Sequence, residues 1–399
     1  MTDWLSPRTA PVSLGGRNSA PHTRLLVRES PLRRNDWVLT VAVAIMCVLG
    51  VLLVWGASYA TRTGHSNAKM EKELIFVVIG VLLGVGTSLL DYRSLRAYAP
   101  VFYVASILGL LAVLAIGTRI NGAKSWIVVG GGFTIQPAEF AKLALVVGLA
   151  MFLGEKREGT DVPRDVDVVM VLALSAVPLG LVLLQPDLGT AVVLGFMILA
   201  AIAVSGAPFR WIAGLVLLAL LGGVGMAATG RLQTYQVARI TSFVNPNATD
   251  KQSVANSYNV RHAQIAIGSG GVFGQGLLHG QLSNTYGYVP EQVDDFIFSV
   301  AGEELGFAGC VGIIGLFGVI LWRGFRIASK ADDAFGRLIA VSIVAWFSFQ
   351  GFENIGMCLG IMPVTGLPLP FISYGGSSLF ANLIAMGLLQ NVHIHSQTA

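Results

Sequence analysis

The chain has 399 residues, of which 54% are hydrophobic and only 12% are charged, and its mean hydropathy is +0.69. Soluble domains carry about 25% charged residues, and a net charge of +4 is too small to indicate binding to a polyanion. This composition excludes a soluble enzyme, a disordered chain and a nucleic-acid-binding protein. It indicates a polytopic integral membrane protein.

Ten apolar segments follow one another along the chain, most of them long enough to cross the roughly 30 Å hydrocarbon core of a bilayer. Lipid offers no partner for an unpaired backbone amide, so all ten are predicted to be α-helices and the fold to be all-α. Gln185-Pro186-Asp187 divides the fifth segment from the sixth. The predicted spans cover residues 37–58, 74–90, 99–117, 138–154, 167–184, 188–205, 210–229, 305–322, 336–357 and 376–392.

The tails and loops give the expected orientation. Residues 1–35 contain six arginines and no cleavable signal, so they are predicted to be a basic, disordered cytoplasmic tail. Lys and Arg are more numerous on the side that carries both termini, which places residues 393–399 in the cytoplasm as well. The membrane domain is then residues 36–392, and residues 230–294, between spans seven and eight, form a large extracytoplasmic loop, here called the outer segment.

The outer segment is far longer than an ordinary connection between packed helices, which indicates a functional role. It holds an amphipathic stretch with Val237, Ile240 and Phe243. Residues 266–276 are rich in glycine and are expected to be irregular, with a backbone that a substrate can approach closely.

Several familiar motifs are absent. The chain contains no Gly-x-x-x-x-Gly-Lys-Ser/Thr phosphate loop, no Gly-x-Ser-x-Gly and no His-Glu-x-x-His. No nucleotide cofactor is therefore expected, and the three cysteines have no metal-binding spacing.

Three carboxylates precede span eight, in the stretch from Pro290 to Phe298. Glu291, Asp294 and Asp295 lie close enough in sequence to repel one another, which favours a raised pKa and a role as general base or metal ligand. The competing interpretation is that they cap the following helix.

Charged residues also occur inside the spans. Glu139 and Lys142 are three residues apart on one helix face, so they either pair with each other or line a polar cavity. Asp187 either caps span six or faces the same cavity. Further acids without a cation nearby in sequence are Glu303, Glu304 and Glu353.

Two extracytoplasmic loops complete the candidate site. Trp126 is either an interfacial anchor or a member of the site. Residues 363–378 contain three prolines and three glycines in an irregular stretch, whose hydroxyl groups can bind freed backbone groups or a phosphate.

Taken together, these motifs resemble the SEDS family of RodA, FtsW and SpoVE, over residues 36–392. The motifs that carry the resemblance are Asn121–Ile127, Gln136–Lys142, Gln185–Thr190, Tyr235–Ile240, Ile265–Gly276, Val289–Phe298, Asn354–Met357 and Pro363–Ser378. The stretches Gly280–Ser283 and Val289–Gln292 look more like RodA than FtsW.

The resemblance implies a multi-pass protein of the bacterial cytoplasmic membrane that polymerises lipid II into glycan strands, together with a class B penicillin-binding protein. It places Asp295 at the essential aspartate. Glu139, Lys142 and Asp187 match polar intramembrane positions of the family, and Trp126 matches its loop tryptophan. Arg239 and Ser377 match further motif positions.

This chain departs from the family pattern beside that aspartate. Val293-Asp294 replaces the common His-Thr, so either Asp294 or Asp295 can act as the base. A divalent cation, Mg²⁺ or Mn²⁺, is expected to assist at Asp295, or else Arg239 or Lys142 stabilises the leaving diphosphate. Two other functions stay open: a transporter of the lipid-linked precursor, and a non-catalytic scaffold for the penicillin-binding protein.

Overall fold

The computed structural model describes residues 34–59, 67–120, 123–130, 133–155, 162–228, 234–248, 250–283 and 288–396. The predicted N-terminal tail lies outside these residues up to position 33, as do residues 397–399 of the C-terminal tail. The elements, in chain order, are α2 (Trp37–Tyr59), α3 (Ala68–Leu89), α4 (Tyr92–Ile116), β1 (Thr118–Ile120), β2 (Ala123–Gly130), β3 (Phe133–Ile135), α5 (Pro137–Leu153), α6 (Asp165–Leu184), α7 (Leu188–Val204), α8 (Phe209–Ala228), α9 (Thr234–Val244), α10 (Lys251–Ser269), α11 (Ile297–Lys330), α12 (Ala334–Leu359) and α13 (Gly376–His395).

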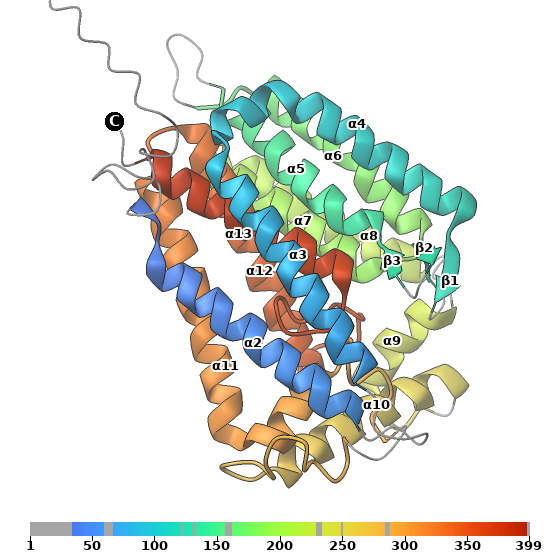
Figure 1. Cartoon of the computed structure of the whole chain (residues 1–399). Coiled ribbons are helices and arrows are strands. Elements are labelled where there is room, and N and C mark those ends of the chain that lie inside the picture. Colours follow the sequence, from blue (N-terminus) through green and yellow to red (C-terminus); the bar gives the residue numbers. More distant parts are fainter. Residues whose placement is uncertain are drawn as a thin grey trace, which may run out of the picture.

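The helices form one bundle in which α12 and α13 are central (Figure 1). Helices α4 to α8 lie on one side of this pair, and α2, α3 and α11 lie on the other. Helices α9 and α10, from the outer segment, lie together at one end of the bundle. The side chains on the outside of α3 and α4 are largely exposed and apolar, as expected for surfaces that face lipid.

Each predicted apolar segment coincides with a helix among the described residues, and six of these helices are long and apolar enough to cross a membrane: α2, α3, α4, α6, α11 and α12. Helices α7 and α8 are also apolar but contribute shorter apolar stretches. The protein is therefore a mostly helical, multi-pass membrane protein, while the number of ten spans stays a prediction.

The beginning of α2 and the end of α13 meet at the end of the bundle opposite α9 and α10 (Figure 1). The backbone N–H of Asp36 donates to Gln390 Oε1 at 3.0 Å, and Gln390 Nε2 donates to the carbonyl of Asp36 at 2.9 Å. Arg323 also forms an ion pair with the Asp36 carboxylate. These bonds hold the first and last helices together, in agreement with termini on one side of a membrane.

The prediction of an all-α fold is wrong in one region. Strands β1, β2 and β3 form a small antiparallel sheet between α4 and α5, in which Ile127 pairs with Ile135 and Thr118 with Trp126. The β-branched run Ile127-Val128-Val129 favours a strand, and a reading based on apolar spans treats such a connection only as a loop.

The glycine-rich part of the outer segment is only partly irregular. Its first four residues, 266–269, complete α10, and the glycines that follow lie against a break in α11 at Gly306, whose φ is +68°. Gln275 N donates to Glu303 O at 2.9 Å, and Phe307 N donates to Gly271 O at 2.9 Å. A Cβ on Gly274 would lie 2.1 Å from Glu304 O. The glycines therefore allow the backbone to pack closely against α11, where a close approach of substrate had been expected.

Candidate active site

A polar cavity of about 250 Å³ brings together segments that are far apart in the sequence. It lies where the sheet, the first turn of α5, the start of α7, α9 and the loops before α11 and α13 meet. Its lining includes seven of the predicted site residues: Trp126, Glu139, Asp187, Arg239, Glu291, Asp294 and Asp295. The other two, Lys142 and Ser377, lie behind its wall.

The carboxylates before α11 do not cap that helix. The N-cap residue is Phe296, which makes no side-chain capping bond, and the first turn of α11 contains no acid. Asp294 and Asp295 instead line the cavity, in a turn where both backbone N–H groups donate to Glu291 O, at 3.2 and 3.0 Å. The structure thus favours the site interpretation of this motif over the capping one.

Both aspartates lie in surroundings that disfavour their ionised form. Burial, followed by the nearby Asp294 and Glu291 carboxylates, raises the pKa of Asp295 to about 7, and the Arg239 guanidinium opposes this rise. Burial also raises the pKa of Asp294 to about 7, with Lys69 opposing and Glu291 adding to the rise. A carboxyl group with a pKa near neutrality is well suited to take up a proton.

Arg239 is positioned by the irregular loop before α13. Its Nη1 donates to Thr365 O at 2.8 Å. A Cβ built on the next residue, Gly366, would lie 3.2 Å from Asp295 Oδ2 and 3.7 Å from Arg239 Nη2. Gly366 has a φ of +75°, which glycine adopts without strain. This glycine therefore permits the backbone to pass close to both Asp295 and Arg239.

Side chains of helix α12 bind the backbone of two segments that line the cavity. Asn354 Nδ2 donates to the backbone carbonyls of Asp295 and Leu367, each at 2.7 Å. Gln350 Nε2 donates to Pro368 O at 2.8 Å. These two amides tie the turn that carries Asp295 and the loop that holds Arg239 to the same rigid helix, which fixes their relative position.

Glu139 and Lys142 form the ion pair that is one of the two predicted alternatives. Their side chains are 1% and 0% exposed, and Lys142 Nζ lies 2.8 Å from Glu139 Oε1. Lys142 also donates to Gln350 Oε1 at 3.0 Å and lies 4.5 Å from the centre of the Trp346 ring. Glu139 lines the cavity, but Lys142 does not. Glu139 therefore both pairs with Lys142 and lines the cavity, as the two alternatives predicted, whereas Lys142 only takes part in the ion pair.

Asp187 likewise combines two predicted roles. It caps α7 by accepting the backbone N–H of Thr190 at 3.0 Å and its hydroxyl at 2.9 Å. It also lines the cavity and accepts a bond from Gln136 Nε2 at 3.1 Å.

Trp126 reaches the cavity from β2, partly buried. Ser377 lies just behind it: its Oγ accepts the Gln136 backbone N–H and donates to Thr134 O, both at 3.1 Å. This hydroxyl therefore joins the start of α13 to the strand and helix of the opposite wall.

Two buried acids lie near the cavity: Glu73, which no sequence motif indicated, and Glu353, which was given no predicted role. Glu73 on α3 is 1% exposed, interacts electrostatically with Asp294 and has one carboxylate oxygen without a partner among the described residues. Glu353 on α12 is fully buried and interacts with Asp295 and Arg239. For Glu353 the signal was an acid within an apolar span, whereas Glu73, near the beginning of α3 and just before the predicted span, resembles an ordinary residue of a helix terminus.

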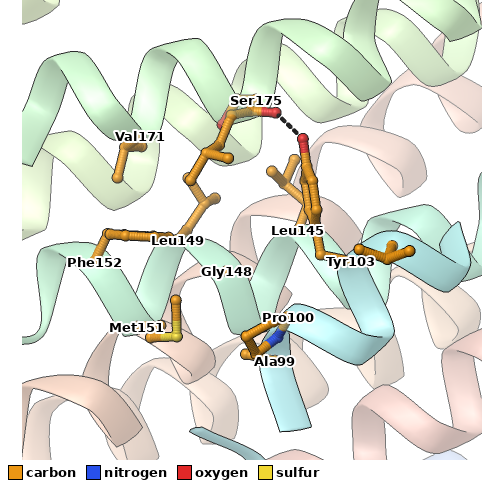
Figure 2. A pocket seen from close by; sticks show the side chains of 12 residues that line it. Ala99, Pro100, Tyr103, Leu145, Gly148, Leu149, Met151, Phe152, Val171 and Ser175 are labelled. Atoms are coloured by element: carbon orange, nitrogen blue, oxygen red, sulfur yellow. Dashed lines mark hydrogen bonds between the residues drawn. The ribbon is translucent and has the colours of Figure 1, made fainter. Parts of the chain in front are cut away.

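A separate apolar cavity of about 150 Å³ lies between α4, α5 and α6 (Figure 2). Its tyrosine is already bonded, since the Tyr103 hydroxyl donates to Leu174 O at 2.7 Å. The lining around it, such as Leu149, Phe152 and Val171, offers hydrocarbon and no acid or base. This cavity has none of the groups that the chemistry of a transferase needs.

The divalent cation expected at Asp295 stays a prediction. In the part of the chain that the structure describes, no three His, Cys, Asp or Glu side chains are close enough to hold one metal ion. The arrangement that the structure does provide is a pair of carboxylates beside a guanidinium, which can accept a proton and stabilise negative charge.

Comparisons with known proteins agree with this architecture. Residues 36–398 match the family model for FtsW, RodA and SpoVE, described as "Cell cycle protein". Stage V sporulation protein E of Bacillus subtilis is 37% identical over 91% of this chain and 98% of its own length. A probable peptidoglycan glycosyltransferase FtsW of Trichlorobacter lovleyi is 34% identical over 92% of this chain and 95% of its own.

The fold is similar to a chain in a solved structure of a peptidoglycan synthase complex. The TM-score is 0.75 at 34% identity, covering 92% of this chain and 99% of the other. Relatives named SpoVE, FtsW and RodA all match, so the predicted RodA-like subtype stays a prediction. This chain belongs to the FtsW/RodA/SpoVE family, the SEDS family predicted from its motifs.

Proposed function

We propose that this protein is a peptidoglycan glycosyltransferase that polymerises lipid II, with Asp295 as its general base. The observation that carries the proposal is the Asp295 carboxylate, whose pKa is raised to about 7, facing Arg239 across Gly366 in a polar cavity. Relatives named peptidoglycan glycosyltransferase, FtsW and RodA, support the reaction class.

The proposed step transfers the growing strand to a new acceptor. The 4-hydroxyl oxygen of the acceptor N-acetylglucosamine forms a bond to C1 of the donor N-acetylmuramic acid, and its proton passes to Asp295. The bond from C1 to the diphosphate oxygen breaks, and undecaprenyl diphosphate leaves with the electron pair. General-base assistance of this kind accelerates reactions by about 10²–10⁴-fold.

Arg239 is suited to a second role in this step. The leaving diphosphate gains negative charge as the bond breaks, and a guanidinium with several fixed N–H donors stabilises such a group well. Lys142 is less suited, because it is fully buried and already bound to Glu139 and Gln350.

The proposed location is the outer face of the bacterial cytoplasmic membrane. The cavity lies toward the end of the bundle that carries α9 and α10, opposite the end where α2 begins and α13 finishes. With both termini in the cytoplasm, as the distribution of Lys and Arg predicts, the outer segment and Asp295 lie outside. A class B penicillin-binding protein is the proposed partner, supported by the similarity to a chain of a peptidoglycan synthase complex.

The test is polymerisation of labelled lipid II by the purified protein, alone and with its penicillin-binding partner. We expect Asp295→Asn to lower the rate by at least about 10²-fold, and Asp294→Asn, the matched neighbour, to retain much more activity. A folded Asp295→Asn protein with wild-type activity would remove Asp295 from the mechanism.

The two alternative functions give different results. A transporter would move lipid II between leaflets in an accessibility assay and form no polymer from substrate supplied on the outer side. A scaffold would tolerate Asp295→Asn and support polymerisation only through its partner.

A further inference from the structure

A second polar cavity of about 340 Å³ adjoins the catalytic one. It lies between α9, α10 and residues 360–364, which follow α12. The same segments serve both cavities: α9 gives Arg239 to the first and Ser242 to the second, while the loop after α12 gives Thr365 to the first and Val364 to the second. The two cavities are therefore next to each other along both segments.

The walls of the second cavity carry groups that both donate and accept hydrogen bonds. The Ser257 hydroxyl is shielded from solvent and has no partner among the described residues. Gln264 donates one bond to Leu359 O at 2.8 Å, and no hydrogen bond to its side-chain oxygen occurs among the described residues. Asn256 adds a second amide. Gly360, with a φ of +74°, makes room for Gln264, because a Cβ there would lie 2.5 Å from Gln264 Nε2.

The charge of this cavity is opposite to that of the catalytic cavity. Arg261 is its only charged lining residue, and no carboxylate pairs with Arg261 in the described part of the chain. By contrast, the catalytic cavity is lined by five acids. Phe243, which is 44% exposed, adds an apolar surface. One cation, several amide and hydroxyl groups and an apolar wall suit a ligand with hydroxyl, amide and carboxylate groups.

We propose that this second cavity binds the peptidyl disaccharide that precedes the donor sugar in the growing strand. The proposal rests on the proposed function above, which places the donor N-acetylmuramic acid at Asp295. About one turn of α9, roughly 5 Å, separates Arg239 from Ser242, so a sugar joined to the donor lies within reach of the second cavity. Asn256, Ser257 and Gln264 bind hydroxyl and amide groups of the sugar, and Arg261 binds a carboxylate of the attached peptide.

Such a site has a kinetic consequence. A strand that stays bound during each transfer receives many disaccharides before it dissociates, so the cavity favours long products. Loss of a charge-assisted hydrogen bond to the peptide speeds dissociation by about tenfold. Mean strand length then falls by a similar factor.

The first experiment measures strand length at equal consumption of labelled lipid II. The variants are Arg261→Glu and the milder Arg261→Gln. The matched control is Lys251→Glu, which makes the same charge change on an exposed residue of α10 outside the cavity. We expect strands about tenfold shorter with Arg261→Glu, an intermediate length with Arg261→Gln, and wild-type length with Lys251→Glu.

Three results would overturn the proposal. The first is wild-type strand length in both Arg261 variants. The second is a raised KM for lipid II at unchanged strand length, which assigns the cavity to the incoming substrate. The third is an effect that appears only when the penicillin-binding partner is present, which assigns this surface to the partner.

A binding experiment separates this proposal from the proposed function. A soluble peptidyl tetrasaccharide lacks the diphosphate and cannot react, so its affinity for the purified protein does not depend on catalysis. We expect Arg261→Glu to weaken this binding by about tenfold and Lys251→Glu to leave it unchanged. Equal affinities in all three proteins would refute the site even if polymerisation is confirmed, and a wild-type protein that binds the saccharide without polymerising lipid II would refute only the proposed function.

Discussion

Replacing Arg239 with Gln should raise the pKa of Asp295 and move the acid limb of the pH–rate profile to higher pH. The base is active only when it is ionised, so activity is lost as the pH falls through its pKa, which is about 7. The positive charge of Arg239 favours the ionised form of Asp295. Without that charge, the same fraction of ionised Asp295 is reached only at a higher pH.

The contacts at Gly366 set the size of the effect. A Cβ there would lie 3.2 Å from Asp295 Oδ2 and 3.7 Å from Arg239 Nη2, so these two atoms are at most about 7 Å apart. Two unit charges at about 7 Å interact with ~0.6 kcal/mol in water and ~2.4 kcal/mol at an effective dielectric constant of about 20. Because about 7 Å is the longest separation that these contacts allow, removing one charge raises the pKa of Asp295 by at least about 0.4 in water and at least about 1.7 at the lower dielectric constant, and high salt reduces the shift.

The assay is kcat/KM for lipid II polymerisation between about pH 5 and 9, since this ratio reports the pKa of the free enzyme's base. Arg239→Lys is the control that keeps the charge, and its midpoint should stay close to that of the wild type. Asp294→Asn should move the midpoint the other way, because the Asp294 carboxylate raises the pKa of Asp295. The plateau rate of Arg239→Gln should also fall as the leaving diphosphate loses a donor.

An unchanged midpoint in Arg239→Gln, with a lower plateau, would show that Arg239 acts on the diphosphate alone. A midpoint that moves to lower pH would refute the assignment of the acid limb to Asp295. The opposite movement in Asp294→Asn makes the test specific, since a general loss of stability would shift both variants in the same direction.

Three further changes test the structure around the site. Lys142→Met should lower the free energy of unfolding by about 3–5 kcal/mol, because it leaves the Glu139 carboxylate buried without its cation. Unfolding measured in micelles should show that the double variant Glu139→Gln/Lys142→Met recovers much of this loss, and equal stability of the single and double variants would contradict the argument. Gly366→Ala should lower the polymerisation rate, because it strains a backbone with φ +75° by about 1–2 kcal/mol and places a methyl group 3.2 Å from Asp295 Oδ2. The control is Gly214→Ala, whose added methyl group has no atom within 4 Å, and equal polymerisation rates of the two variants would contradict the prediction. Glu303→Gln should loosen residues 280–283, because the carboxylate accepts the backbone N–H groups of Leu282 and Ser283 at 2.6 and 2.8 Å, and one unsatisfied group costs about 1–3 kcal/mol. The measurement is backbone hydrogen exchange, which should be faster in residues 280–283 of the variant, and wild-type exchange rates would count against this role.

The positions of the helices could be predicted because lipid imposes a simple rule on the sequence. Every apolar segment became a helix, and Gln185-Pro186-Asp187 divides α6 from α7 as predicted. The same rule does not apply beyond the membrane. There, β2 follows local β-propensity, and the glycines at 270 and 274 are explained only by the backbone of α11, about thirty residues further along the chain.

The membership of the site could be predicted better than its geometry. Motifs identified Asp295, Arg239 and Trp126, which the fold brings to one cavity. No motif distinguishes Glu139, which lines that cavity, from Lys142, which lies behind it, since both are on one face of α5. The sequence also gives no reason to select Glu73, whose neighbour Asp294 is more than two hundred residues away.

The junction between the outer segment and the break in α11 is made by main-chain atoms. Such a joint is insensitive to side-chain chemistry, so Phe273, which is 83% exposed, can change freely while Gly274 and Gly306 cannot accept even a methyl group. The helical segment from Ile297 to Leu305 is bonded at its C-terminal end to the glycine-rich backbone. At its N-terminal end it follows the turn that carries Asp295, which Asn354 holds by a hydrogen bond. Because fewer than three helical turns separate the two contacts, we expect a shift of the glycine-rich segment to move the turn that carries Asp295 as well.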